Sequence, residues 1–271
     1  MVNHVEGHHE ITTKNKLFSN ITQFMDSREE LCFAELLPLT FCIEVKLSDV
    51  DDCSINDALS QFKSIFKLLK THSEDLLQRK PEQEFGEPDL TAQPLRKNRQ
   101  PLLLPTSHFV GSNVWILKPT GLNRGKGIHV VNSFKALKSQ VKYYCQDAQK
   151  QNQMPSMPRN LVQDRKNFVI QKYIERPLLL NNRKFDIRVW ALLTQDMDLY
   201  FFREGYLRLS SKPFALDNFQ DEITHLTNVA IQKYSKLFGK TEDGNQLSFA
   251  DLRSYMRKNN FLADFDKDVL P

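Results

Sequence analysis

The stretch Arg183-Lys184-Phe185-Asp186-Ile187-Arg188 alternates charged and apolar side chains, which predicts a β-strand. Successive side chains of a strand point to opposite faces, so Lys184, Asp186 and Arg188 are expected to share one face. The apolar residues between and after them are expected to share the other face and to point into a core. A row of cation, anion and cation is costly to bury without partners. The charged face is therefore either solvated or directed at a charged ligand.

The composition is that of an ordinary globular protein. The chain has 271 residues, of which 40% are hydrophobic and 26% are charged, and its formal net charge is +4. So small a positive charge does not indicate nucleic acid as a partner. The four cysteines show no close pairing, which argues against a zinc ribbon or a disulfide framework. No apolar stretch has the length of a membrane span or the character of a signal sequence, so we expect a cytoplasmic protein without a membrane partner.

Composition along the chain predicts three parts. Residues 1–72 form an N-terminal segment, and residues 107–271 form the main lobe. Between them, residues 73–106 are polar and contain five prolines, which is typical of a linker or a mobile loop.

Hydrophobic periodicity predicts the main helices and the first strand. A strand is predicted at 37–50, and the next helix is predicted to begin at Ser54, with Asp57 completing a capping box. The apolar stripe of this helix consists of Ile55, Leu59, Phe62, Phe66 and Leu69. Further helices are predicted at 133–145 and from about Ser248.

A β-hairpin is predicted where two apolar runs, 114–118 and 128–131, flank a glycine-bearing loop. The Gln/Asn-rich stretch 149–167 is predicted to be disordered. Later strands are predicted at 168–173, 185–193, 199–203 and 206–209.

The hairpin loop Gly121-Leu122-Asn123-Arg124-Gly125-Lys126-Gly127 is a candidate phosphate-binding loop. It is not a Walker A motif, because the glycine spacing is one residue short and Gly127 replaces the required Ser or Thr. It is a flexible, basic hairpin tip whose backbone N–H groups could close over phosphate oxygens. Lys118, at the end of the preceding apolar strand, must reach either solvent or an anion. A plain glycine-rich turn is the alternative.

Two further segments lie where a ligand could be recognised. The segment Gln171-Lys172-Tyr173-Ile174 ends a strand, and such a strand end either recognises an adenine edge or is a simple turn. No local period explains the polar cluster His225-Leu226-Thr227-Asn228, and Arg208 lies in a nearby strand.

Several of these motifs, in this order, resemble the tubulin–tyrosine ligase and ligase-like family. The matching segments are Trp115-Ile116-Leu117-Lys118, Arg124-Gly125-Lys126-Gly127-Ile128, Gln171-Lys172-Tyr173-Ile174, Arg183 to Arg188 and His225 to Asn228. The stretch from Asn218-Phe219-Gln220-Asp221 through Ile231-Gln232-Lys233-Tyr234-Ser235 to Gly244-Asn245 resembles the family as well. The resemblance covers about residues 3–256. It implies the ATP-grasp fold, an α+β architecture of mixed or antiparallel sheets with flanking helices, here with an incomplete C-terminal lobe.

The resemblance also implies roles for individual residues. Those that it assigns to the nucleotide are Lys14, Lys118, Arg124, Gly125, Lys126, Gly127, Gln171, Lys172, Tyr173, Ile174, Lys184, Asp186, His225 and Thr227. Those that it assigns to catalysis are Arg188, Arg208 and Asn228. Fixed cations at such positions would neutralise the charge that develops on a transferring phosphoryl group.

The implied reaction joins a free amino acid to a carboxyl group of tubulin through an acyl phosphate, with ATP and Mg²⁺ as cofactors. Glutamate, glycine and tyrosine are all open as the added residue, and polyglutamylation is one possible outcome. A monomer associated with microtubules, the cytoskeleton or a cilium is expected. An ATP-grasp ligase acting on a substrate other than tubulin is an alternative.

The sequence departs from the family pattern at both ends. The family's late magnesium motifs, a strand with an Asp and Trp-Leu-x-Glu-Val-Asn, are absent, and the last residues offer only Asp264, Asp266 and Asp268. The usual small N-terminal lobe is largely missing as well. We therefore expect a truncated chain without metal ligands of its own, and a second alternative is a catalytically impaired nucleotide- or microtubule-binding fragment.

Overall fold

The computed structural model of the protein describes residues 5–27, 37–48, 50–78, 112–153, 164–259 and 265. The chain divides into two compact units, each of which is described by itself. The first unit comprises residues 9–123 and 127–176, and the second comprises residues 1–8, 124–126 and 177–271. Residues 79–106 of the predicted linker lie outside the described residues.

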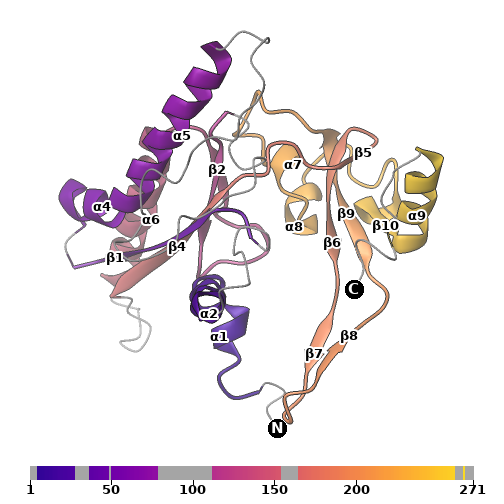
Figure 1. The fold of residues 1–271 in the computed structure, drawn as a ribbon, viewed down its shortest axis with the longest axis horizontal. Coiled ribbons are helices and arrows are strands. Elements are labelled where there is room, and N and C mark those ends of the chain that lie inside the picture. Colours follow the sequence, from indigo (N-terminus) through magenta and orange to yellow (C-terminus); the bar gives the residue numbers. More distant parts are fainter. Residues whose placement is uncertain are drawn as a thin grey trace. The chain divides into compact units, whose positions relative to one another are not determined.

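The first unit is built on a four-stranded antiparallel sheet (Figure 1). Its strands, in spatial order, are β1 (Thr40–Lys46), β4 (Arg165–Lys172), β2 (Trp115–Pro119) and β3 (His129–Val131). The predicted hairpin is confirmed, because Trp115 of β2 lies opposite Val131 of β3. The strands alternate between buried apolar and more polar residues, so one face of the sheet belongs to a core.

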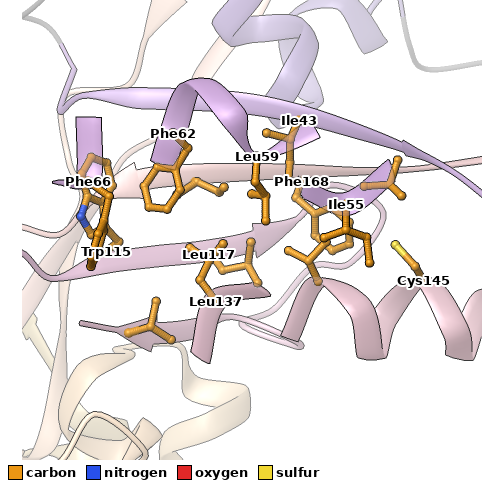
Figure 2. Close-up of a cluster of buried hydrophobic side chains, with 14 of the residues drawn as sticks. Ile43, Ile55, Leu59, Phe62, Phe66, Trp115, Leu117, Leu137, Cys145 and Phe168 are labelled. Atoms are coloured by element: carbon orange, nitrogen blue, oxygen red, sulfur yellow. The ribbon is translucent and has the colours of Figure 1, made fainter. Parts of the chain in front are cut away.

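Three helices cover this apolar face: α4 (Asp52–Ala58), α5 (Ser60–Gln78) and α6 (Phe134–Asn152). The predicted helical stripe is confirmed, since all five of its residues are buried. Figure 2 shows Ile55, Leu59, Phe62 and Phe66 gathered with Trp115, Leu117 and Phe168 of the strands. The ring of Phe62 packs edge-on against Trp115, with ring centroids 4.9 Å apart. Aromatic packing of this kind adds to the stabilisation from apolar burial.

The boundaries of these helices differ from the prediction. The first begins earlier, at Asp52, because the capping box is formed by Asp51 and Ser54 instead of Ser54 and Asp57. Helix α6 continues to Asn152 instead of ending at Cys145, since Ala148 is buried and Gln149 donates a hydrogen bond to the Leu47 carbonyl. Disorder was therefore the wrong prediction for residues 149–152, and also for residues 165–167, which belong to β4.

Two helices at the start of the first unit bring a lysine to the sheet. Helix α1 (His9–Thr12) is followed by α2 (Lys14–Asp26), which contacts β4. Met25 is the buried residue of α2, whereas Leu17 is 39% exposed.

The second unit contains another four-stranded antiparallel sheet. In spatial order its strands are β10 (Gln246–Ser248), β9 (Tyr206–Pro213), β6 (Arg183–Arg188) and β5 (Leu179–Leu180). Helix α9 (Phe249–Lys258) supplies Phe249, Leu252 and Met256 to a small core beside this sheet. Its predicted capping box, Ser248 with Asp251, is confirmed.

Short elements complete the second unit. Helices α7 (Glu222–His225) and α8 (Val229–Gln232) precede the 3₁₀ turn η4 (Asp243–Asn245). Strands β7 (Ala191–Leu193) and β8 (Leu199–Phe201) form a separate two-stranded sheet.

The long strand predicted at 185–193 is two strands. β6 pairs with β9 up to Arg188, and the chain then continues as β7, which pairs with β8. The two strands are separate because residues 203–205, which lie opposite the break between β6 and β7, are not part of a strand. Phe185 and Val189 pack against the core as expected. Ile187 between them is 36% exposed, since this small core does not cover the whole apolar face. Strand β8 ends at Phe201, two residues earlier than predicted.

Both units therefore combine antiparallel sheets with packed helices, and the chain has an α+β fold. Every strand pair among the described residues is antiparallel. No helix in the described part of the chain is long and apolar enough to cross a membrane.

Candidate functional site

Two lysines lie on the face of the first sheet that the core helices leave uncovered. Lys118 is on β2 and alternates with the buried residues Trp115 and Leu117. Its ammonium group donates a hydrogen bond to Oε1 of Gln171 at 2.7 Å, across the sheet. Lys14 of α2 donates to the carbonyl of Leu122 at 2.8 Å, in the loop that follows β2. Both cations predicted for this region therefore belong to one local site.

The electrostatics of this lysine pair favour an anion. Burial, together with the positive charge of Lys14, lowers the pKa of Lys118 to about 8. Burial also lowers the pKa of Lys14. Among the described residues, no carboxylate forms an ion pair with either lysine. An anion bound here would replace lost hydration and reduce the repulsion between the two cations.

The glycine loop has a backbone that requires its glycines. Gly125 and Gly127 adopt positive φ angles of 82° and 69°, which side chains disfavour. A Cβ atom on Gly125 would lie 2.9 Å from Oδ1 of Asn228, within the second unit. Arg124 and Lys126 on either side of Gly125 are exposed. The loop therefore combines a close backbone approach with two accessible cations.

The segment predicted to line adenine is shaped by a buried ion pair. The Lys172 ammonium lies 2.5 Å from Oε1 of Glu175 and also donates to the carbonyl of Val114. Burial lowers the pKa of Lys172, and Glu175 opposes that shift. The side chain of Lys172 is thus engaged within the protein.

Tyr173 and Ile174 extend this segment in different environments. The Tyr173 backbone N–H donates to the Val114 carbonyl, and burial of its ring raises the pKa of the phenol. The side chain of Ile174 is 57% exposed. Of the segment 171–174, the side chains of Gln171 and Ile174 are the more accessible.

Sequence reasoning missed Glu175, which fixes this segment. Its carboxylate accepts hydrogen bonds from the backbone N–H groups of Ser112 and Val114 as well as from Lys172. A carboxylate that accepts several such bonds ties the end of β4 to the start of β2. A glutamate three residues after a lysine at a strand end was the available signal.

In the second unit, the charged face of β6 is present as predicted and is internally paired. Lys184 donates to the carbonyl of His225 at 2.9 Å. Asp186 accepts two hydrogen bonds from Arg208 of β9, from Nε at 2.8 Å and from Nη2 at 2.5 Å. This pairing raises the pKa of Arg208. Arg188 is exposed.

The cluster at 225–228 is held close to this face. His225 is 1% exposed, and its Nε2 lies 3.0 Å from the carbonyl oxygen of Asn218. Its ring stacks on Phe219 at an interplanar angle of 20°. Burial lowers the pKa of His225, so the neutral form is favoured near pH 7. Thr227 is buried, and Asn228 occupies the N-cap position of α8.

A buried amide that sequence reasoning missed supports the cluster. Gln232 is fully buried, and its side chain forms hydrogen bonds with the backbone at Ser211, Ile223 and Leu226. Its sequence signals were a glutamine in the apolar run that begins at Val229 and its place in a stretch that resembles the family, neither of which indicated a role.

The described residues do not fit a magnesium site. They contain no group of three or more His, Cys, Asp or Glu side chains arranged to hold a metal ion. Asp186 is already paired with Arg208, and Asp264, Asp266 and Asp268 lie outside the described residues. No chemical step is therefore assigned to a metal held by these residues.

Comparison with known proteins places these motifs in a family context. A model of the tubulin-tyrosine ligase family matches residues 1–262. Tubulin glycylase 3B of Tetrahymena thermophila is 34% identical over 187 residues, which are 68% of this chain and 14% of that protein.

Two animal proteins match shorter stretches. Tubulin glycylase 3A of Drosophila melanogaster is 40% identical over 124 residues, which are 45% of this chain and 11% of that protein. The Homo sapiens tubulin monoglycylase TTLL3 is 36% identical over 124 residues, which are 45% of this chain and 14% of that protein. The chain thus spans only a small part of the length of these relatives.

Proposed function

Because the chain belongs to the tubulin–tyrosine ligase family, we propose that it carries the nucleotide-binding part of an ATP-dependent ligase that adds glycine to tubulin. The names of the relatives favour glycine over glutamate or tyrosine, since they are tubulin glycylases and monoglycylases. In this proposal the fold is an ATP-grasp fold, and tubulin and a free amino acid are the partners.

The observation that carries the proposal is the lysine pair in the first unit. Lys14 and Lys118 are partly buried cations that form no ion pair with a carboxylate of the described residues, so a bound anion would offset part of the cost of burying their charges. A polyphosphate is the anion that the family resemblance supplies. The proposal places the phosphates of ATP against these ammonium groups, with Gln171 orienting Lys118.

The family resemblance also proposes roles for residues of the second unit, taken by itself. Asp186 would meet the ribose, while Arg188 and Arg208 would neutralise charge on the transferring phosphoryl group. Lys184 would meet the nucleotide from the same strand as Asp186, and Thr227 and Asn228, with His225, would form the motif between the phosphates and the incoming amino acid. At the adenine segment, Lys172 would act by shaping the backbone through Glu175 instead of by direct contact.

The proposed reaction has two steps. A carboxylate oxygen of the acceptor attacks the γ-phosphorus of ATP, and ADP leaves with the electrons of the broken phosphorus–oxygen bond. The amino nitrogen of glycine then attacks the acyl carbon, the new amide bond forms, and inorganic phosphate and a proton are released. The protein contributes fixed cations and a shared geometry, which are the main requirements of phosphoryl transfer.

A second candidate function is a nucleotide-binding module without ligase activity. The bidentate bond between Arg208 and Asp186 favours it, because this pair engages both a proposed phosphate contact and a proposed ribose contact. ATP would have to displace that bond before both side chains could bind it.

Two measurements on the full chain test these functions. The first is binding of ATP to the wild type, to Lys118→Met and to Lys67→Met, in which an exposed lysine of α5 serves as a matched control. We expect Lys118→Met to weaken binding by about tenfold, as for the loss of one charge-assisted contact, and Lys67→Met to leave it unchanged. Equal affinities of all three proteins would reject the lysine site.

The second measurement is incorporation of labelled glycine, glutamate or tyrosine into purified tubulin. Incorporation of glycine that requires ATP supports the ligase. ATP binding without any incorporation supports the nucleotide-binding module.

A further inference from the structure

Strand β9 is irregular at the point where the cluster at 225–228 packs against it. The register between β6 and β9 shifts between Arg183 and Phe185, because their partners on β9 are Pro213 and Leu209. Three residues of β9, 210–212, therefore lie opposite the single residue Lys184. Such a bulge leaves backbone groups without ladder partners.

Two buried side-chain amides form hydrogen bonds with β9 at this bulge. Oε1 of Gln232 accepts from the backbone N–H of Ser211 at 2.6 Å. Nδ2 of Asn245 donates to the carbonyl of Leu209 at 3.2 Å and to Oγ of Ser211 at 2.8 Å. The exposed fractions of Gln232 and Asn245 are only 0% and 2%. Buried amides with all these bonds made are specific, rigid connectors.

Only one of the two amides reaches the cluster at 225–228. Nε2 of Gln232 donates to the carbonyl of Ile223 at 2.8 Å and to the carbonyl of Leu226 at 2.6 Å. These two carbonyls flank His225, and Leu226 directly precedes Thr227. The third bond of Asn245 is instead to the backbone N–H of Gly239, away from this segment.

We infer that Gln232 is a positioning residue for the segment 225–228: its amide ties the backbone on both sides of His225 to the bulge of β9 and thereby sets where Thr227 and Asn228 lie. This inference rests on the proposed nucleotide-binding function of that segment. Lys184, which donates to the carbonyl of His225, holds the same backbone from the neighbouring strand β6.

Asn245 provides a matched control. Both amides are buried, both contact β9, and each makes three hydrogen bonds to the protein. Gln232→Met and Asn245→Leu each remove three hydrogen bonds and keep the approximate side-chain volume. Because Asn245 has a positive φ of 55°, which leucine disfavours, Asn245→Leu should destabilise the chain at least as much as Gln232→Met. Only Gln232→Met should nevertheless release the segment 225–228.

The first readout does not require a ligand. In hydrogen–deuterium exchange of the free chain, Gln232→Met should accelerate exchange at residues 223–228 by about tenfold or more, relative to the wild type. Asn245→Leu should leave exchange at those residues unchanged and accelerate it around residues 239–245. Unchanged exchange at 223–228 in Gln232→Met would overturn the inference.

The second readout is the ratio of ATP affinity to adenosine affinity, which isolates the contribution of the phosphates. Gln232→Met should lower this ratio by about tenfold without changing adenosine affinity, and Asn245→Leu should keep the wild-type ratio. An equal fall in both variants would show a general loss of stability and would overturn the positioning role.

A third variant, Gln232→Glu, is a milder change that can be measured if Gln232→Met does not fold. Gln232→Glu keeps an acceptor for the Ser211 N–H and, when protonated in its buried site, offers one donor to the two carbonyls. It should give changes in exchange and in affinity ratio that lie between those of the wild type and Gln232→Met. If the wild type binds neither ATP nor adenosine, the proposed function fails, while the exchange experiment still decides whether Gln232 holds the segment.

Discussion

At the scale of single residues, the site is defined by cations whose partners lie far away in the sequence. The alternation at 183–188 placed Lys184 and Asp186 on one face, and the structure agrees. It could not identify Arg208 as the partner of Asp186, because that contact depends on the register between two strands. The lowered pKa of Lys118 likewise arises from burial and from Lys14, which is more than a hundred residues away.

This pKa predicts proton uptake when ATP binds. With a pKa of about 8, Lys118 is mostly unprotonated at pH 8.5, and phosphate groups beside it should raise the pKa. Binding at pH 8.5 should therefore take up on the order of half a proton, and binding at pH 6.5 almost none. Isothermal titration calorimetry in two buffers of different ionisation enthalpy measures this number. In Lys118→Met the uptake at pH 8.5 should disappear, and its persistence would assign the proton to another group.

At the scale of elements, the periodic segments were predictable and the positions of their ends were not. The stripe from Ile55 to Leu69 and the hairpin of β2 and β3 follow from hydrophobic periodicity alone. The cap at Asp51, the extension of α6 to Asn152 and the break after Arg188 depend on side-chain hydrogen bonds and on strand pairing. Such tertiary contacts override local preference. Because the hydrogen bonds of Glu175 and Gln232 are also tertiary contacts, the sequence alone did not predict the roles of these two residues.

The end of β4 is tied to the start of β2 by the buried ion pair of Lys172 and Glu175. Lys172 and Glu175 are almost fully buried, so Glu175→Gln leaves a buried ammonium without its counter-charge. We expect a loss of about 3 kcal/mol or more in the free energy of unfolding, measured by urea denaturation.

Asp52→Asn, which breaks the exposed pairs with Lys138 and Lys142, should cause no resolvable change and serves as the control. A similarly small effect of Glu175→Gln would show that the buried pair does not stabilise this connection.

At the scale of the whole molecule, the described residues form two cores that are built from different elements. One contains Phe62 and Trp115 with helices α4, α5 and α6, and the other contains Phe249 with α9 and the sheet of β6 and β9. Each core is made by residues of its own unit. Local stability is therefore expected to differ between the units.

Truncation of one core should act on its own unit. Phe249→Ala should cost the second unit about 3–5 kcal/mol, the usual range for a buried phenylalanine. Hydrogen exchange should then accelerate in β6 and β9, with β2 and β4 little affected. Equal acceleration in both sheets would indicate that the two units unfold as one cooperative body.

The lysine pair has a consequence for the chemical labelling of the molecule. At pH 7.4 a lysine with a pKa of about 8 is roughly one-fifth free amine, whereas an ordinary lysine is about 0.1% free amine. The free amine is the nucleophile, so Lys118 should react with small acylating reagents faster than a lysine of equal accessibility with an ordinary pKa. A nucleotide that covers it would slow that reaction. The rate of acylation at Lys118, measured by mass spectrometry, should therefore report whether a nucleotide is bound to the first unit.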